Sequence, residues 1–200
     1  MAEHAAGWIG DRAIDSGPFR IALTGGSKVG AVYERLADKE LDWGAWHVWW
    51  SDERDVPPDH EDSNERLARE TLLSRVPIPE EQIHPLRSTD VQLPPRFDLI
   101  LLGIGPDGHT ASLYPGHDAE LAATEPVIYV PEPGWPPPHP RYTFTLAYIS
   151  SQPVAVFLVG GEEKREILGR VLAGDESLPA ARVNAPMTVI LADEAAAPPR

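Results

Sequence analysis

The sequence predicts an α/β fold in which a doubly wound, mostly parallel sheet carries helices on both faces. About six short apolar segments with the composition of strands alternate with helical or loop segments, and most connections are long enough for a crossover. Glycine-rich or charged stretches follow directly after several of these strands. The carboxyl ends of parallel strands share one edge of a sheet, so these polar stretches are expected to meet there.

The bulk composition restricts both the organisation and the partners of the chain. Its 200 residues, 42% of them hydrophobic, predict a single globular domain over residues 1–200. Without an apolar segment near the ~20 residues that span a bilayer, and with charges throughout residues 1–17, we expect a cytoplasmic protein with no membrane partner. A net charge of −14 argues against a nucleic-acid partner, and the lack of cysteine excludes disulfides and thiol nucleophiles.

The first third of the chain predicts a strand, a glycine turn and a helix. Residues 1–17 are expected to form a short helix or a loosely ordered terminus, because glycines limit the helix length. Residues 19–23 predict a core strand and residues 29–38 a helix. Between them lie Gly25, Gly26, Ser27 and Lys28. Backbone N–H groups of such a turn can hold an anion, although a tight turn without a ligand is the alternative, since neither phosphate-loop nor dinucleotide spacing is present.

A second strand is predicted at residues 47–50, whose aromatic side chains are expected in the core because no basic residues alternate with them. It is followed by Asp52 and Arg54. The guanidinium of Arg54 can bind a carboxylate or phosphate, or the two residues can simply pair and cap locally. Residues 65–73 have the apolar spacing of an amphipathic helix.

The segment 97–109 contains the strongest chemical signal. A buried strand over residues 97–102 is predicted to end in a tight glycine loop that presents Asp107, Gly108 and His109. A histidine in a loop is ordinarily a hydrogen-bonded surface residue, but an imidazole with a pKa near ~6.5 can also accept a proton at neutral pH. Asp107 can orient that imidazole or form an Asx turn.

The remaining chain supplies further strands with cations at their ends. A brief helix is predicted near residues 120–124, and strands are predicted at residues 127–130, 141–146, 154–159 and 188–191. The proline-rich residues 131–140 form either a surface loop or a lid. Arg141 begins one strand, and Lys164 begins a helix over residues 164–173. A lysine is electrostatically unfavourable at the start of a helix unless an anion binds there.

Several of these segments resemble the 6-phosphogluconolactonase family, in the order in which that family has them, over about residues 20–192. The segments lie at 23–37, 50–64, 97–116, 141–146, 156–164 and 178–183, and the specific strings within them are SDER at 51–54 and DGHTASL at 107–113. The resemblance implies the fold shared with glucosamine-6-phosphate deaminases and ribose-5-phosphate isomerases. It further implies hydrolysis of 6-phospho-D-glucono-1,5-lactone, in the oxidative pentose phosphate pathway, without a metal or cofactor.

The resemblance also implies roles for individual residues. His109 would be the general base for the attacking water, oriented by Asp107, and either Arg54 or the N–H groups around Gly108 would stabilise the oxyanion. The residues expected to bind the rest of the phosphorylated substrate are Gly25, Gly26, Ser27, Lys28, Asp52, Gly108, Arg141 and Lys164.

Departures from the family pattern leave alternatives open. Lys28 and Val29 replace the usual Thr-Pro, the amino-terminal helix is short, and a helix usual before the strand at residue 97 is missing from residues 85–96. Sheet surface left uncovered would favour a homodimer over a monomer. Two other functions stay open beside lactone hydrolysis. One is that of a deaminase or isomerase, although residues 112–115 lack the acidic residue of the deaminases. A non-catalytic sugar-phosphate sensor is the other, although a sensor needs no water activator.

Overall fold

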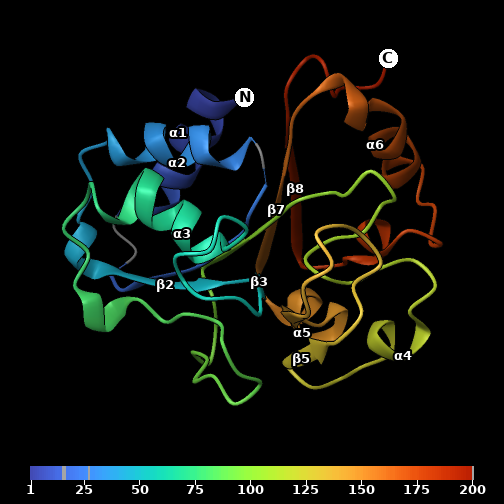
Figure 1. The fold of residues 1–200 in the computed structure, drawn as a ribbon. Coiled ribbons are helices and arrows are strands. Elements are labelled where there is room, and N and C mark those ends of the chain that lie inside the picture. The colour runs from blue at the N-terminus through green and yellow to red at the C-terminus, as the bar shows by residue number, and fades with distance from the viewer. Residues whose placement is uncertain (15–16, 27, 200) are drawn as a thin grey trace.

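The computed structural model describes residues 1–14, 17–26 and 28–199, whose strands form two sheets (Figure 1). A parallel sheet has the strand order β2-β1-β4-β7-β8, and an antiparallel sheet has the order β3-β6-β5. The strands of the parallel sheet are β1 (Phe19–Leu23), β2 (Trp46–Trp50), β4 (Leu99–Leu102), β7 (Val154–Val159) and β8 (Met187–Ala192). Those of the antiparallel sheet are β3 (Asp52–Arg54), β5 (Val127–Val130) and β6 (Arg141–Phe144).

Helices cover both faces of the parallel sheet, as predicted. The helices of the described residues are α1 (Ala2–Ala13), α2 (Val29–Ala37), α3 (Asn64–Ala68) with its π-helical continuation η2 (Arg69–Leu73), α4 (Asp118–Leu121), α5 (Leu146–Ser151) and α6 (Arg165–Leu172). Short 3₁₀ turns are η1 (Trp43–Ala45), η3 (Glu80–Gln82), η4 (Glu162–Lys164) and η5 (Pro179–Arg182). Among the described residues, no helix has both the length and the apolar character needed to cross a membrane.

The strand order explains the placement of the helices. The connection from β1 to β2 and that from β7 to β8 run in opposite directions across the sheet, so right-handed crossovers place α2 and α6 on opposite faces. Figure 1 shows α2 grouped with α1 and α3 on one side of the molecule and α6 on the other. The direction reverses between β1 and β4, which makes the carboxyl ends of these two strands the expected ligand-binding crevice.

Strand β4 is the centre of the core. All of its residues are fully buried, and it pairs with β1 on one side and β7 on the other. Because both faces are covered, its sequence LILL is continuously apolar instead of alternating. The strand is therefore held firmly at the position from which the following loop presents its polar residues.

The amino-terminal residues Ala2–Ala13 form the helix α1. Helix α1 has one apolar face, and Ala5, Ala6 and Ile9 on it are fully buried, with α1 packed on α2. Over Ala2–Ala13 the structure has the helix that was one of the two alternatives, and residues 15 and 16 lie outside the described residues. Gly7 and Gly10 do not interrupt the helix, which runs through both positions.

The second sheet was not predicted, since all strands were expected to join one mainly parallel sheet. Ser51 joins the two sheets: its N–H donates to the Leu23 carbonyl, and its own carbonyl accepts from the Phe144 N–H. The three-residue strand β3 is too short to show a strand pattern in the sequence. Its antiparallel pairing with β6 places Arg54 opposite Arg141, so two strands of this sheet bring their arginines together.

The absence of a helix between residues 85 and 96 is confirmed, but the sheet beneath is not left open. The irregular segment buries Leu86, which is 1% exposed, and its Gln92 carbonyl accepts a hydrogen bond of 3.0 Å from the Trp49 indole. Trp49 is consequently 5% exposed. The expectation of uncovered sheet surface at this position was wrong, and it gives no reason for dimerisation.

Candidate active site

A cavity of about 430 Å³ opens at the carboxyl edge of the parallel sheet, between that sheet and the antiparallel one. This volume lies within the range typical of small-molecule sites. The side chains and backbone that line it include Thr24, Gly25, Gly26, Lys28, Asp52, Arg54, Asn64, His109, Tyr114, Trp135, Arg141 and Lys164. These residues come from segments that are far apart in the sequence, and they include most of the predicted site residues.

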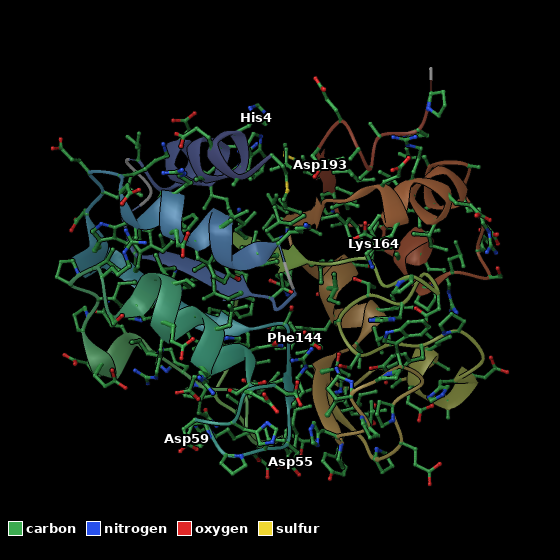
Figure 2. The ribbon with its side chains drawn as sticks, turned by 45° about the horizontal axis from the view of Figure 1, so that its top comes forward. His4, Asp55, Asp59, Phe144, Lys164 and Asp193 are labelled. Carbon is green, nitrogen blue, oxygen red and sulfur yellow. The ribbon has the colours of Figure 1, made fainter. Side chains whose placement is uncertain are left out.

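Two predicted site residues, Asp107 and Gly108, do not belong to that lining. Asp107 lies behind His109, and Gly108 is buried in the loop that follows β4. Ser27 lies outside the described residues. Lys28 is exposed at the first residue before α2, whereas Lys164 is half-buried at the start of α6, beside the loop after β4 (Figure 2).

His109 and Asp107 form a hydrogen-bonded pair. The Nδ1 atom of His109 lies 2.5 Å from Oδ1 of Asp107, which also accepts the His109 backbone N–H at 3.1 Å. Asp107 thus both orients the imidazole and forms the Asx turn, which the sequence left as alternatives. Burial by itself raises the pKa of Asp107. The hydrogen bond and charge of His109, together with backbone N–H groups, lower it by more, so the pKa of Asp107 is below its usual value. The ionised carboxylate accepts the Nδ1 proton and leaves the Nε2 lone pair of His109 as a base.

Glycines shape the loop that holds this pair. A Cβ atom at Gly105 would lie 2.0 Å from Nδ1 of His109, so only glycine leaves space for the imidazole. Gly108 has a φ of +86° and packs against Leu178, and its carbonyl accepts from the Ala180 N–H at 3.1 Å. The segment at 178–183, which the family resemblance included without a role, therefore anchors the loop.

The Gly108 N–H cannot serve as the predicted oxyanion donor. It donates to the Gly105 carbonyl at 3.0 Å and completes the tight turn. The adjacent His109 N–H is likewise occupied by Asp107. We therefore correct that assignment. The N–H groups of Gly108 and His109 form hydrogen bonds within the loop, and Arg54 is the remaining predicted oxyanion donor.

The cations of the cavity have no carboxylate partners. Among the described residues, Lys28, Arg54, Arg141 and Lys164 form no salt bridge. Burial lowers the pKa of both Arg141 and Lys164. Asp52 acts on Arg141 and Glu163 on Lys164 through their charges, but no carboxylate forms an ion pair with either cation. Partly desolvated positive charges that lack a direct ion pair favour a bound anion. In a chain with a net charge of −14, this concentration of positive charge marks an anion-binding site.

Arg141 also organises the proline-rich loop. The residue is 3% exposed, and its guanidinium donates to the carbonyls of Trp135, Pro137 and His139 at 3.4, 2.9 and 3.2 Å. Trp135 and Pro136 line the cavity, so residues 131–140 form part of its wall.

Within the string SDER, Glu53 has a structural role. Its buried carboxylate accepts the backbone N–H groups of Arg54, Asn64 and Glu65 at 2.7–2.8 Å and the Ser63 hydroxyl at 3.1 Å. It thereby satisfies the free N–H groups at the start of α3. Burial raises the pKa of Glu53 against the opposing effect of these N–H donors. The carboxylate fixes the strand that carries Arg54.

Replacing Glu53 by alanine is expected to destabilise the fold by about 2–4 kcal/mol, because several buried N–H donors lose their acceptor at once. Urea denaturation followed by circular dichroism measures the change in the free energy of unfolding. The exposed Glu40→Ala is the control and should change it by no more than about 0.5 kcal/mol. Equal stability of the two variants would contradict the structural role of Glu53.

Sequence reasoning missed several residues of the cavity. The Asn64 side chain occupies the space beside Gly25, where a Cβ atom would lie 1.9 Å from its Oδ1 atom. The Tyr114 hydroxyl is buried beside Ser112, and burial raises the pKa of Tyr114. Both residues lie inside segments that carry the family resemblance, which was the available signal. Asp52 lines the cavity and accepts the Ser112 hydroxyl at 2.7 Å, tying β3 to the segment after His109.

The strand connections reverse direction between β1 and β4, and a histidine–carboxylate pair and cations without ion pairs lie at the carboxyl ends of these strands. This arrangement defines an α/β enzyme with an anion-binding site. The chain belongs to the family described as glucosamine-6-phosphate isomerases/6-phosphogluconolactonase, whose model matches residues 1–191. The resemblance found in the sequence and the predicted fold class are thereby confirmed.

Individual relatives agree with this membership. The chain is 41% identical over 180 residues to the 6-phosphogluconolactonase of Synechocystis, covering 80% of this chain and 73% of the relative. It is 34% identical over 206 residues to a probable chloroplastic 6-phosphogluconolactonase 3 of rice, covering 88% of this chain but 63% of that relative. The crystal structure of 6-phosphogluconolactonase from Thermotoga maritima superposes with a TM-score of 0.84 at 30% identity, covering 96% of this chain and 94% of that one.

Proposed function

We propose that this chain is a 6-phosphogluconolactonase, which hydrolyses 6-phospho-D-glucono-1,5-lactone to 6-phosphogluconate. The observation that carries the proposal is a histidine–carboxylate pair facing a cavity whose cations have no carboxylate partner. The names of the cyanobacterial relative and the Thermotoga structure support the choice of substrate. The expected pathway, cytoplasmic location, single domain and monomeric or homodimeric state stay predictions.

In the proposed mechanism His109 activates water. Its Nε2 atom takes a proton as the water oxygen attacks the lactone carbonyl, which becomes an oxyanion. Asp107 stabilises the imidazolium that forms. When the oxyanion collapses, the bond between the carbonyl carbon and the ring oxygen breaks, and His109 returns the proton to that oxygen. The products are a free hydroxyl and a carboxylic acid, which ionises.

The cations of the cavity have two roles in this mechanism. Arg54 is assigned to the oxyanion, because its buried Nε has no hydrogen-bond partner among the described residues. One well-placed donor of this kind contributes about 3–4 kcal/mol. Lys164, Arg141 and Lys28, with the backbone at Gly25 and Gly26, are assigned to the phosphate, which these charges attract against the acidic field of the whole chain.

The proposal is tested by measuring acid release from freshly generated 6-phosphogluconolactone and from the unphosphorylated lactone at constant pH. Spontaneous hydrolysis is measured without protein and subtracted. We expect catalysis with a clear preference for the phosphorylated lactone. The unphosphorylated lactone has no phosphate for the cavity cations to bind. Equal rates for the two lactones would contradict the phosphate site, and binding of 6-phosphogluconate without turnover would instead identify a sensor.

The Lys164→Ala variant is expected to raise KM for the phosphorylated lactone about 10–100-fold and to leave hydrolysis of the unphosphorylated lactone unchanged. A charge-assisted hydrogen bond to phosphate is worth about 1.5–3 kcal/mol, which corresponds to this range. Steady-state kinetics with both lactones provides the measurement. Lys39→Ala, which removes a lysine paired with Glu3 on the surface, is the matched control. A loss of the same size with both lactones would place Lys164 at the reacting end of the substrate instead.

A further inference from the structure

We propose a second site, outside the proposed chemistry: a divalent transition-metal site for Zn²⁺ formed by His60, Asp62 and His139. These residues lie on two loops at the rim of the cavity. His60 and Asp62 belong to the loop between β3 and α3, which also carries the acidic Asp55 and Asp59 (Figure 2). His139 lies near the end of the proline-rich loop, immediately before β6.

The three side chains already point their donor atoms at one another. Nε2 of His139 lies 3.0 Å from Oδ2 of Asp62, and Nδ1 of His60 lies 3.8 Å from the same oxygen. All three donor atoms lie within 4.8 Å of one another. Bonds of about 2.0–2.2 Å in a tetrahedral zinc site imply donor separations of about 3.3 Å, so the widest pair has to approach by at most about 1.5 Å. The side chains are 30–34% exposed, which leaves them room to rotate and leaves the site open to ions from solution.

The donor set matches the chemistry of zinc. Two imidazoles and one carboxylate are ligands that Zn²⁺ accepts, with water in the fourth position. Nδ1 of His60 accepts the Asp62 backbone N–H at 3.1 Å, so this nitrogen carries the lone pair that a metal requires. Coordination would exchange this weak hydrogen bond for a metal–nitrogen bond.

A simple hydrogen bond between the two loops is the competing explanation. It accounts for His139 and Asp62. The Asp62 N–H turns Nδ1 of His60 towards the same residue, and the His60 ring packs edge-on at 5.1 Å from the His139 ring, but His60 takes no part in the bond between the loops. A hydrogen-bonded clamp needs one histidine, whereas a metal site needs both. The two explanations therefore differ in what they predict for His60.

The surrounding charges favour a cation on balance. Asp55, Asp59 and Glu61 are exposed acidic residues of the same loop, and the chain as a whole has a net charge of −14. The positive charges of Arg54 and Arg141 on the cavity side oppose the metal, as does Arg66, whose Nη1 donates to the Asp59 carbonyl at 3.1 Å. The guanidiniums of Arg54 and Arg141, however, face backbone carbonyls at this rim and leave the Asp62 carboxylate to the two imidazoles.

A metal at this position would hold both cavity arginines indirectly. The Asp62 carbonyl accepts a hydrogen bond from Nη1 of Arg54, and the His139 carbonyl accepts from Nε of Arg141 at 3.2 Å. Two of the proposed ligands thus carry the acceptors that position these guanidiniums. Bound zinc would cross-link the two loops and fix that geometry, without taking part in the hydrolysis, for which we expect no metal.

The test uses the full chain without a polyhistidine tag, dialysed against Zn²⁺, with bound metal measured by mass spectrometry. Co²⁺ absorption reports the ligand geometry, and thermal unfolding is measured with and without Zn²⁺. We expect one Zn²⁺ per chain, a raised Tm, and at least tenfold weaker binding in each of His60→Gln, Asp62→Asn and His139→Gln. Asp62→Asn keeps the backbone carbonyl that holds Arg54, so it isolates the loss of the carboxylate.

His117→Gln is the matched control, because His117 also lies near a carboxylate, 3.9 Å from Glu120, but has no second histidine beside it. It should bind zinc as the unmodified chain does. The proposal is overturned if the unmodified chain takes up no zinc at micromolar concentration, or if His60→Gln binds it as tightly as the unmodified chain. None of these readouts depends on catalysis, so their failure leaves the proposed lactonase function untouched.

Discussion

The His109→Gln variant is expected to keep its fold and to lose a factor of about 10²–10⁴ in kcat for the phosphorylated lactone. Gln preserves much of the polarity and size of histidine but cannot accept a proton at neutral pH, and general-base catalysis is typically worth this factor. The cations that line the same cavity are unchanged in this variant. Substrate binding should therefore survive, and the loss should appear in kcat and not in KM.

Steady-state hydrolysis above the spontaneous rate measures this loss. Circular dichroism and binding of 6-phosphogluconate, the expected product, show that the fold and the cavity remain. His4→Gln, at an exposed position of α1, is the matched control and should retain the original rate. If turnover by His109→Gln stays within about threefold of the unmodified chain, another group is the base.

The Gly105→Ala variant is expected to reduce turnover about 100-fold or more, although it removes no ionisable group. The added Cβ atom would lie 2.0 Å from Nδ1 of His109 and 2.7 Å from Oδ1 of Asp107, and neither separation is tolerable. The imidazole must move, which breaks its bond to Asp107 and misplaces the base. A displacement of about 1 Å from the reactive geometry is sufficient for a 10²-fold loss.

Kinetics and a crystal structure of Gly105→Ala test this expectation together, the second by showing the separation between Nδ1 and Oδ1. Gly7→Ala is the control, because a Cβ atom there meets nothing within 4 Å and the residue lies in α1, away from the cavity. Unchanged turnover by Gly105→Ala would mean that the contact between His109 and Asp107 is dispensable for the reaction.

Most strands, and the polar groups that follow them, are predictable because local composition determines them. The apolar runs that become β1, β4 and β7 form strands at the predicted places, and Asp107 and His109 are only two residues apart, so their contact depends on one local loop. Local composition does not predict the antiparallel sheet. Its strand β3 has three residues, and the juxtaposition of Arg54 with Arg141 exists only through pairing with a distant strand.

The tertiary structure also determines which polar groups are free to bind a ligand. The Gly108 N–H is consumed by a turn, and Glu53 is occupied by α3, whereas Arg54, Arg141 and Lys164 are left without carboxylate partners among the described residues. His60, Asp62 and His139 are unremarkable in sequence and meet only when two loops pack together.

By itself, the sequence determined the α/β class, the positions of the main strands along the chain and the family-specific strings around His109 and Arg54, because hydrophobic patterning and short motifs are properties of neighbouring residues. Only the tertiary structure decided that Glu53 supports the fold, that Arg54 lies opposite Arg141, and that Gly108 has no donor to offer. The physical reason is that a donor, an acceptor or a charge can bind a ligand only if the folded chain has not already given it a partner, and contacts between distant segments decide this.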